Sequence, residues 1–198
     1  MTVRITLVAP AVNAALREAR FDDDGPLEEA GRAHASSVRR SWGVREEAVF
    51  SSPSARCRET ALALGLETAE PLAALAGCAM GRWRGRSLAE VADEEGESVA
   101  AWLSDPGAAP HGGESLRALR ERVGGWLDTP RPAGRLLAVA EPDVVRAAVV
   151  HALGTDDRTF WRLDVRPLAA VHLTGRSGRW NLRLGEPSAG PGTAEADA

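Results

Sequence analysis

The sequence predicts a three-layer α/β/α fold, with helices on both faces of a mainly parallel central sheet. Short apolar runs of strand length alternate along the chain with longer segments in which apolar residues recur at helical spacing. This alternation is typical of a sheet covered by helices on both faces. The 198 residues suffice for one well-buried core. We therefore expect a single domain over residues 1–185, followed by a polar, disordered tail over residues 186–198.

The first third of the chain contains two expected strands and two expected helices. Residues 3–8 form a β-branched apolar run, which reads as a buried strand. After a polar loop, Pro26 is expected to open a helix, because apolar residues recur at helical spacing from Leu27 to Trp42. Residues 48–52 read as a second strand, and Pro53 is expected to begin a helix that runs to about Leu64.

The rest of the chain continues the alternation and closes with a hairpin. Residues 68–86, which hold three glycines, read as irregular, and residues 105–113 read as a loop. Four helices are expected: a weak one from Ser87, another from about Ser98, one over 114–127 and one from Pro142 to about Gly154. Strands are expected over 135–140, 168–174 and 179–184, the last two flanking a GRSG turn.

Composition narrows the classes of function. The net charge of −4 argues against a nucleic acid or a membrane surface as partner, since both favour a basic field. No apolar run approaches the ~18 residues of a spanning helix, and the N-terminus lacks a signal-peptide pattern, so a cytoplasmic location is expected. Neither lysine nor tyrosine occurs, so proton chemistry must use His, Asp, Glu, Cys or water. The two cysteines have no metal-type spacing, and no cofactor is expected.

Five segments, in order, resemble a known family. They are FDDDGPLEEAGRAHA (21–35), SSPSARCRETA (51–61), AALAGCAMGRWRG (73–85), HGGESLRALRERV (111–123) and LLAVAEPDVVRAAVVHALG (136–154). Together they resemble the histidine phosphatase superfamily, in its phosphoglycerate mutase-like branch, over roughly residues 3–185. The resemblance implies the phosphoglycerate mutase-like fold, and it places the ligand site beyond the carboxyl ends of the strands.

The resemblance also implies a particular chemistry, whose residues are largely replaced here. In the family, a histidine of an "RHG" turn attacks a phosphoryl group, and arginines and a second histidine hold its oxygens. Ala-Pro-Ala stands at this turn, at residues 9–11, and Glu141 stands at the second histidine. The family's acid positions fall on Gly77 and Arg84, and only Arg56 keeps its family identity. The resemblance thus implies a divergent member that lacks the catalytic histidines.

The remaining polar residues leave several roles open. Glu141 and Asp143 flank Pro142 and can serve acid/base chemistry or a divalent cation, or they can be ordinary acids at a helix N-terminus. His111 can be a base, a metal ligand or an exposed loop histidine. Arg56 is expected to face Glu141, either as an anion clamp or as its ion-pair partner.

A second group of residues is expected to contribute to ligand binding beside Arg56. This group comprises Pro10, Asn13, Cys78, Arg82, Glu114 and Ser115. Among the tryptophans, Trp83 and Trp102 are expected to wall the pocket, whereas Trp126, Trp161 and Trp180 are expected to pack in the core or the hairpin.

Three functions follow from these residues. The leading interpretation is a pseudophosphatase that binds a small ligand or a protein partner in a remodelled cleft, with a homodimer as one option. The alternative is a repurposed enzyme of a biosynthetic pathway, in which Glu141, Asp143, His111 and Arg56 perform acid/base chemistry. A third interpretation is an accessory protein that binds a divalent metal through the same carboxylates.

Overall fold

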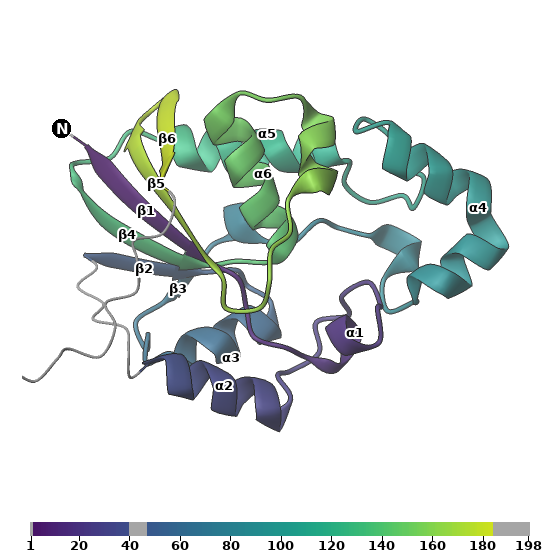
Figure 1. Cartoon of the computed structure of the whole chain (residues 1–198), viewed down its shortest axis with the longest axis horizontal. Helices are drawn as coiled ribbons and strands as arrows, with labels where there is room; N and C mark the ends of the chain where they lie inside the picture. The colour runs from purple at the N-terminus through teal and green to yellow at the C-terminus, as the bar shows by residue number, and fades with distance from the viewer. Residues whose placement is uncertain (1, 40–46, 184–198) are drawn as a thin grey trace, which may run out of the picture.

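A six-stranded mixed sheet forms the centre of the protein (Figure 1). The computed structural model describes residues 2–39 and 47–183. Within them the strand order is β3-β2-β4-β1-β5-β6, with parallel pairing from β3 to β1 and antiparallel pairing of β5 and β6. The strands are β1 (Val3–Val8), β2 (Ala48–Ser51), β3 (Glu70–Pro71), β4 (Gly134–Val139), β5 (Ala170–Arg176) and β6 (Arg179–Arg183). The predicted α/β class and mainly parallel sheet are confirmed.

Two pairs of helices cover the two faces of the sheet (Figure 1). On one face, α2 (Glu29–Arg39) packs beside α3 (Ala55–Ala63), over a cluster that includes Val8, Leu137 and Val139. On the other face, α5 (Leu116–Asp128) packs beside α6 (Pro142–Leu153), over a larger cluster that includes Ile5 and Leu7. The side chains of β1 that face α5 and α6 are buried, whereas on the opposite face Val8 is buried, Thr6 is partly buried and Arg4 is exposed.

The register of the parallel strands brings their carboxyl ends into one row. Val139 lies opposite Val8 on one side and opposite Ser51 on the other. The chain segments that follow these strands therefore leave the sheet at the same edge. Beyond this edge lie α1 (Ala14–Arg17) and α4 (Leu88–Ser104), the latter well away from the sheet (Figure 1).

Three short 3-10 helices complete the described structure: η1 (Ala73–Leu75), η2 (Gly81–Trp83) and η3 (Asp157–Arg162). None of the helices in the described ranges is long and apolar enough to cross a membrane.

Several element boundaries differ from the sequence predictions. Helix α2 begins at Glu29 rather than at Pro26, because the Leu27 amide donates to Glu59 Oε2 and Leu27 bridges to Asn13. The two weak helices expected from Ser87 and from about Ser98 are one helix, α4, with non-helical dihedrals at Glu95. The expected irregular stretch 68–86 holds β3, η1 and η2. Trp42 and the tail over 186–198 lie outside the described residues.

Candidate functional site

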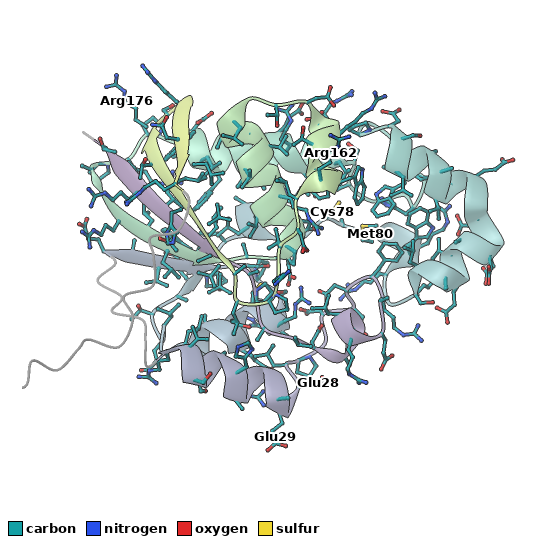
Figure 2. The ribbon with its side chains drawn as sticks, viewed as in Figure 1. Glu28, Glu29, Cys78, Met80, Arg162 and Arg176 are labelled. Atoms are coloured by element: carbon teal, nitrogen blue, oxygen red, sulfur yellow. The ribbon has the colours of Figure 1, made fainter. Side chains whose placement is uncertain are left out.

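A cavity of about 530 Å³ lies at the carboxyl edge of the sheet. Its lining includes four arginines and four acids: Arg20, Arg56, Arg84, Arg146, Asp22, Asp24, Glu141 and Asp143. Aromatic and sulfur-containing side chains supply much of the rest, namely Phe21, Cys78, Met80, Trp102, Phe160 and Trp161. Cys78 and Met80, labelled in Figure 2, belong to the segment between η1 and η2. The formal charges of the lining balance, so the cavity has no overall preference for an anion.

The most buried feature of the site is an ion pair between Arg56 and Glu141. Arg56 lies in the first turn of α3 and Glu141 is the residue before Pro142 of α6, so the parallel register brings them together. Their side chains are each only 6% exposed, and Arg56 Nη2 donates to Glu141 Oε2. Arg56 Nη1 donates to Asn13 Oδ1 over 3.1 Å. The expectation that Arg56 faces Glu141 is therefore confirmed.

Neighbouring donors hold the Glu141 carboxylate in place. Ser54 Oγ donates to Glu141 Oε1 over 2.8 Å, and the Cys57 thiol lies 3.3 Å from the same oxygen. Burial alone would lower the pKa of Arg56, but the Glu141 carboxylate raises it above its usual value. Burial, and then Glu141, raise the pKa of the Cys57 thiol well above its usual value. The guanidinium is therefore charged, and Cys57 is a neutral thiol at physiological pH.

Asp143 forms a second carboxylate at the same edge, on the first turn of α6. Its Oδ2 accepts from the Cys78 amide over 2.5 Å and its Oδ1 accepts from the Val144 amide over 2.8 Å. Burial raises its pKa to about 6, with the Cys78 amide opposing the shift and Glu141 adding to it. Asp143 therefore exchanges its proton close to neutral pH, as a general acid or base must.

The segment around Cys78 closes the cavity against α6. A Cβ built on Gly77 would lie 3.1 Å from Glu141 Cγ, so a side chain at this position would crowd the ion pair. The Cys78 thiol lies 3.2 Å from the Glu114 carbonyl. Burial, and then the charges of Asp143 and Glu114, raise the pKa of Cys78. Its thiol is therefore protonated and is a poor nucleophile.

His111 does not line the cavity with Glu141 and Asp143. It is 1% exposed, its Nδ1 accepts from the Gly113 amide over 3.0 Å, and its ring centroid lies 5.0 Å from that of Trp83. Burial, and then the charge of Arg82, lower the pKa of His111, so the imidazole is neutral. It is thus a buried residue of its loop, neither the exposed histidine nor the cavity base that the sequence left open.

The other expected binding residues divide between the cavity and its supports. Cys78 lines the cavity, and Asn13 supports Arg56 while its Oδ1 also accepts from the Leu16 amide of α1. Ser115 caps α5, and Pro10 is buried and is not among the residues that line the cavity. Two charged residues are occupied elsewhere: Arg82 pairs with Glu95, and Glu114 pairs with Arg122.

Sequence reasoning missed several residues that line the cavity. Arg20 and Arg146 received no role, although Arg146 follows Asp143 by one helical turn and therefore lies on the same face of α6. Trp161, expected to be a packing residue, lines the cavity beside Trp102, with ring centroids 4.6 Å apart. Trp83 is fully buried behind it instead. The polar loop expected before Pro26 also reaches the site, because Asp22 is half-buried, lines the cavity and has its Oδ1 3.5 Å from Asn13 Nδ2.

In the parts of the chain that the structure describes, no three His, Cys, Asp or Glu side chains are grouped so that they could hold a metal ion. The paired carboxylates Glu141 and Asp143 are engaged with Arg56 and with backbone amides instead. The geometry therefore gives the metal-binding interpretation no ligand set.

Comparisons with known proteins identify the family. The family model of the histidine phosphatase superfamily (branch 1) matches residues 11–186. The chain belongs to this superfamily. No protein of curated function matches the sequence significantly.

Solved structures of phosphatases share the fold. The alpha-ribazole phosphatase from Shigella flexneri superposes with a TM-score of 0.80 at 19% identity, covering 96% of this chain and 100% of that one. A mycobacterial glucosyl-3-phosphoglycerate phosphatase superposes with a TM-score of 0.78 at 23% identity, covering 92% and 98%. A mycobacterial hydrolase gives a TM-score of 0.79 at 23% identity, covering 96% and 100%. At these identities the similarity establishes the fold alone.

Proposed function

We propose that this protein does not transfer phosphoryl groups and instead binds a small organic ligand in the cavity at the carboxyl edge of the sheet. One observation carries the proposal: the Glu141 carboxylate lies on the Arg56 guanidinium, in the place where an arginine of a phosphatase would meet a phosphoryl group. The anion-binding side chain is thus occupied by an anion of the protein itself.

Electrostatic repulsion by Glu141 supports the proposal that the site does not bind a phosphoryl group. Two like unit charges about 4 Å apart repel by roughly 4 kcal/mol at an effective dielectric of about 20. A phosphate beside Arg56 would meet the buried Glu141 charge and, above pH 6, that of Asp143 as well. The Arg56 guanidinium is already paired with Glu141, so its attraction for a phosphate is largely cancelled.

The absence of an evident nucleophile points the same way. The segment after β1 reads Ala-Pro-Ala, and Pro10 within it is buried and has neither a nucleophilic atom nor an amide hydrogen. Both cysteine thiols, at residues 57 and 78, have a raised pKa and stay protonated. Within the described residues, no histidine lines the cavity.

A hydrolysis assay tests the proposal. The purified protein is incubated with p-nitrophenyl phosphate and with a set of phosphate monoesters, and the released phosphate is measured against protein-free buffer. We expect no release above the buffer rate. Release that scales with protein concentration and is lost in Arg56→Gln would refute the proposal, because it would show that Arg56 still serves a phosphoryl group.

A second candidate function is supported by Asp143 alone. Its raised pKa of about 6 suits a general acid or base, so the cavity could convert the ligand that it binds. Mass spectrometry of a bound ligand, after incubation with the wild type or with Asp143→Asn, separates binding from turnover. A product that forms only with the wild type would favour this enzyme; an unchanged ligand would favour the binding protein.

A further inference from the structure

Two side chains of opposite charge line the cavity from the same face of α6, and among the described residues no ion pair joins them. Asp143 and Arg146 are one helical turn apart, where Cβ atoms lie about 5–6 Å from each other. Asp143 accepts from the amides of Cys78 and Val144. Arg146 donates through Nε to the Leu163 carbonyl over 2.7 Å. Asp143 and Arg146 thus both line the cavity, and the hydrogen bonds described for each are made with backbone groups.

The carboxylate side of this pair has an excess of negative charge. The Glu141 charge raises the pKa of both Asp22 and Asp143, and the Arg56 charge lowers both. Arg122, which is itself paired with Glu114, also interacts with Asp143. Arg56 is already paired with Glu141. Burial, and then repulsion by Glu141, raise the pKa of Asp22, and the attraction of Arg56 only partly opposes them. A ligand cation at this end of the cavity would relieve that repulsion.

Within the part of the chain that the structure describes, Arg146 bonds through Nε, so the terminal nitrogens of its guanidinium can reach a ligand. The structure describes a carbonyl partner for Nε of Arg146 and places its guanidinium 5.6 Å from the centroid of the Phe160 ring. Arg146 is half-buried, so its guanidinium is less solvated than that of a free surface arginine. The terminal nitrogens of a guanidinium form the fork that binds a carboxylate with two parallel bonds.

Aromatic rings form an apolar part of the cavity wall. Trp102 and Trp161 meet with ring centroids 4.6 Å apart, and Phe160 meets Trp161 at 5.1 Å. Trp102 is 8% exposed, and its indole N–H has no hydrogen-bond partner among the described residues. A buried donor without a partner is uncommon, and it is satisfied if a bound molecule brings an acceptor to it.

We propose that the cavity binds a small zwitterion, whose ammonium group lies against Asp143 and Asp22 and whose carboxylate lies against Arg146. The carbon skeleton of the zwitterion packs on Trp102 and Trp161. This inference rests on the proposed function, because it takes the cavity to be a ligand site in which Arg56 is not free to hold a phosphate. The equal numbers of arginines and acids in the lining agree with a ligand of no net charge.

A series of amino acids of graded length tests the proposal. The probes are glycine, β-alanine, 4-aminobutyrate and 6-aminohexanoate, with phenylalanine as an α-amino acid that adds an aromatic ring. Matched probes with one charge are propylamine, propionate and phenethylamine. Thermal shift and titration calorimetry at pH 7.5 report binding. We expect at least one zwitterion to raise the melting temperature and to bind more tightly than every single-charge probe.

Variants assign the two ends of the ligand. Arg146→Gln and Asp143→Asn each should weaken the binding of that zwitterion by about tenfold or more, because each removes a hydrogen bond between charged groups. Arg162→Gln is the matched control, since Arg162 is exposed on η3 (Figure 2), does not line the cavity and loses the same charge. If Arg146→Gln does not give a cooperative melt, Arg146→Lys tests the charge without the fork.

The outcomes separate this inference from the function on which it rests. Amines that bind as tightly as zwitterions, or an Arg146→Gln variant that binds as the wild type does, would overturn the zwitterion. A panel that produces no shift at all, in a protein that also releases no phosphate, would overturn it as well and leave the non-phosphatase proposal standing. Release of phosphate from monoesters would overturn the proposed function itself.

Discussion

Replacing Glu141 by alanine should convert the site into an anion-binding site. The substitution removes the carboxylate that lies on Arg56, and it leaves space beside Gly77, where Glu141 now packs. Arg56 then remains as an uncompensated charge that is only about one twentieth exposed (5%). Removing one partner of a buried ion pair costs about 3–5 kcal/mol. For a chain of this size that corresponds to a melting temperature lowered by roughly 6–20 °C.

Inorganic phosphate should restore part of this loss in the variant. An anion at 100 times its dissociation constant stabilises the folded state by about 2.7 kcal/mol. The assay is a thermal melt of wild type and Glu141→Ala over a phosphate titration, with sodium chloride at matched ionic strength. We expect phosphate to raise the melting temperature of Glu141→Ala more than chloride does, and to leave that of the wild type at the chloride value.

A matched variant controls for the loss of a carboxylate. Glu114→Ala breaks an ion pair with Arg122 that lies outside the cavity and is partly exposed, at 18% and 26% of the side chains. It should show no specific response to phosphate. The reasoning fails if wild type and Glu141→Ala respond equally to phosphate, because Glu141 would then not be what keeps anions from Arg56.

Three further predictions concern stability and reactivity. The folded-state pKa of Asp143, about 6, lies above the unfolded value, so the folded state holds the extra proton and loses stability as the pH rises from about 4 to about 6. The Asp143→Asn variant should therefore flatten the pH dependence of urea unfolding over this window. At pH 7 its free energy of unfolding should exceed that of the wild type by roughly 1–3 kcal/mol. Asp128 accepts from the Gly178 amide and from a tryptophan indole of the β5–β6 hairpin, and it pairs with His151 over 2.9 Å. Asp128→Ala should therefore lower the free energy of unfolding, measured by urea titration, by about 2–3 kcal/mol. A change below about 0.5 kcal/mol would show that this network does not anchor the hairpin. The raised pKa values of Cys57 and Cys78 predict that neither thiol reacts with iodoacetamide at pH 7.4 in the folded protein, whereas both react in urea. Mass spectrometry of the treated chain counts the alkylated cysteines. Rapid alkylation of the folded protein would contradict the assignment of both thiols as protonated.

The sequence predicted the sheet and the edge at which the cavity lies, because these depend on local patterns. The apolar run over 3–8 and the proline that opens α6 appear in the structure as β1 and the first residue of that helix. The pairing of Arg56 with Glu141 followed from the resemblance, since both residues stand at aligned strand ends. These features need only the order of elements and the parallel register.

The composition of the cavity could not be predicted in the same way. Trp161 and Phe160 reach the cavity from η3, and nothing in the local pattern tells whether an aromatic side chain packs inward or lines a pocket. His111 was expected in an exposed loop or at the cavity, but a glycine turn and the ring of Trp83 bury it. Asp22 lies in a polar run, yet it is half-buried in the cavity lining, where its carboxylate is near Asn13. Whether each of these side chains is buried or lines the cavity depends on contacts between elements that are far apart in the chain, and local sequence patterns do not reveal such contacts.

Titration calorimetry of the wild-type protein with inorganic phosphate and with vanadate, at pH 7.5 and low ionic strength, tests the central claim most directly. The claim is that the Glu141 carboxylate occupies Arg56 and keeps tetrahedral oxyanions out of the cavity. It predicts no saturable heat up to millimolar concentrations of either anion. Saturable binding of one anion per chain, abolished by Arg56→Gln, would contradict it.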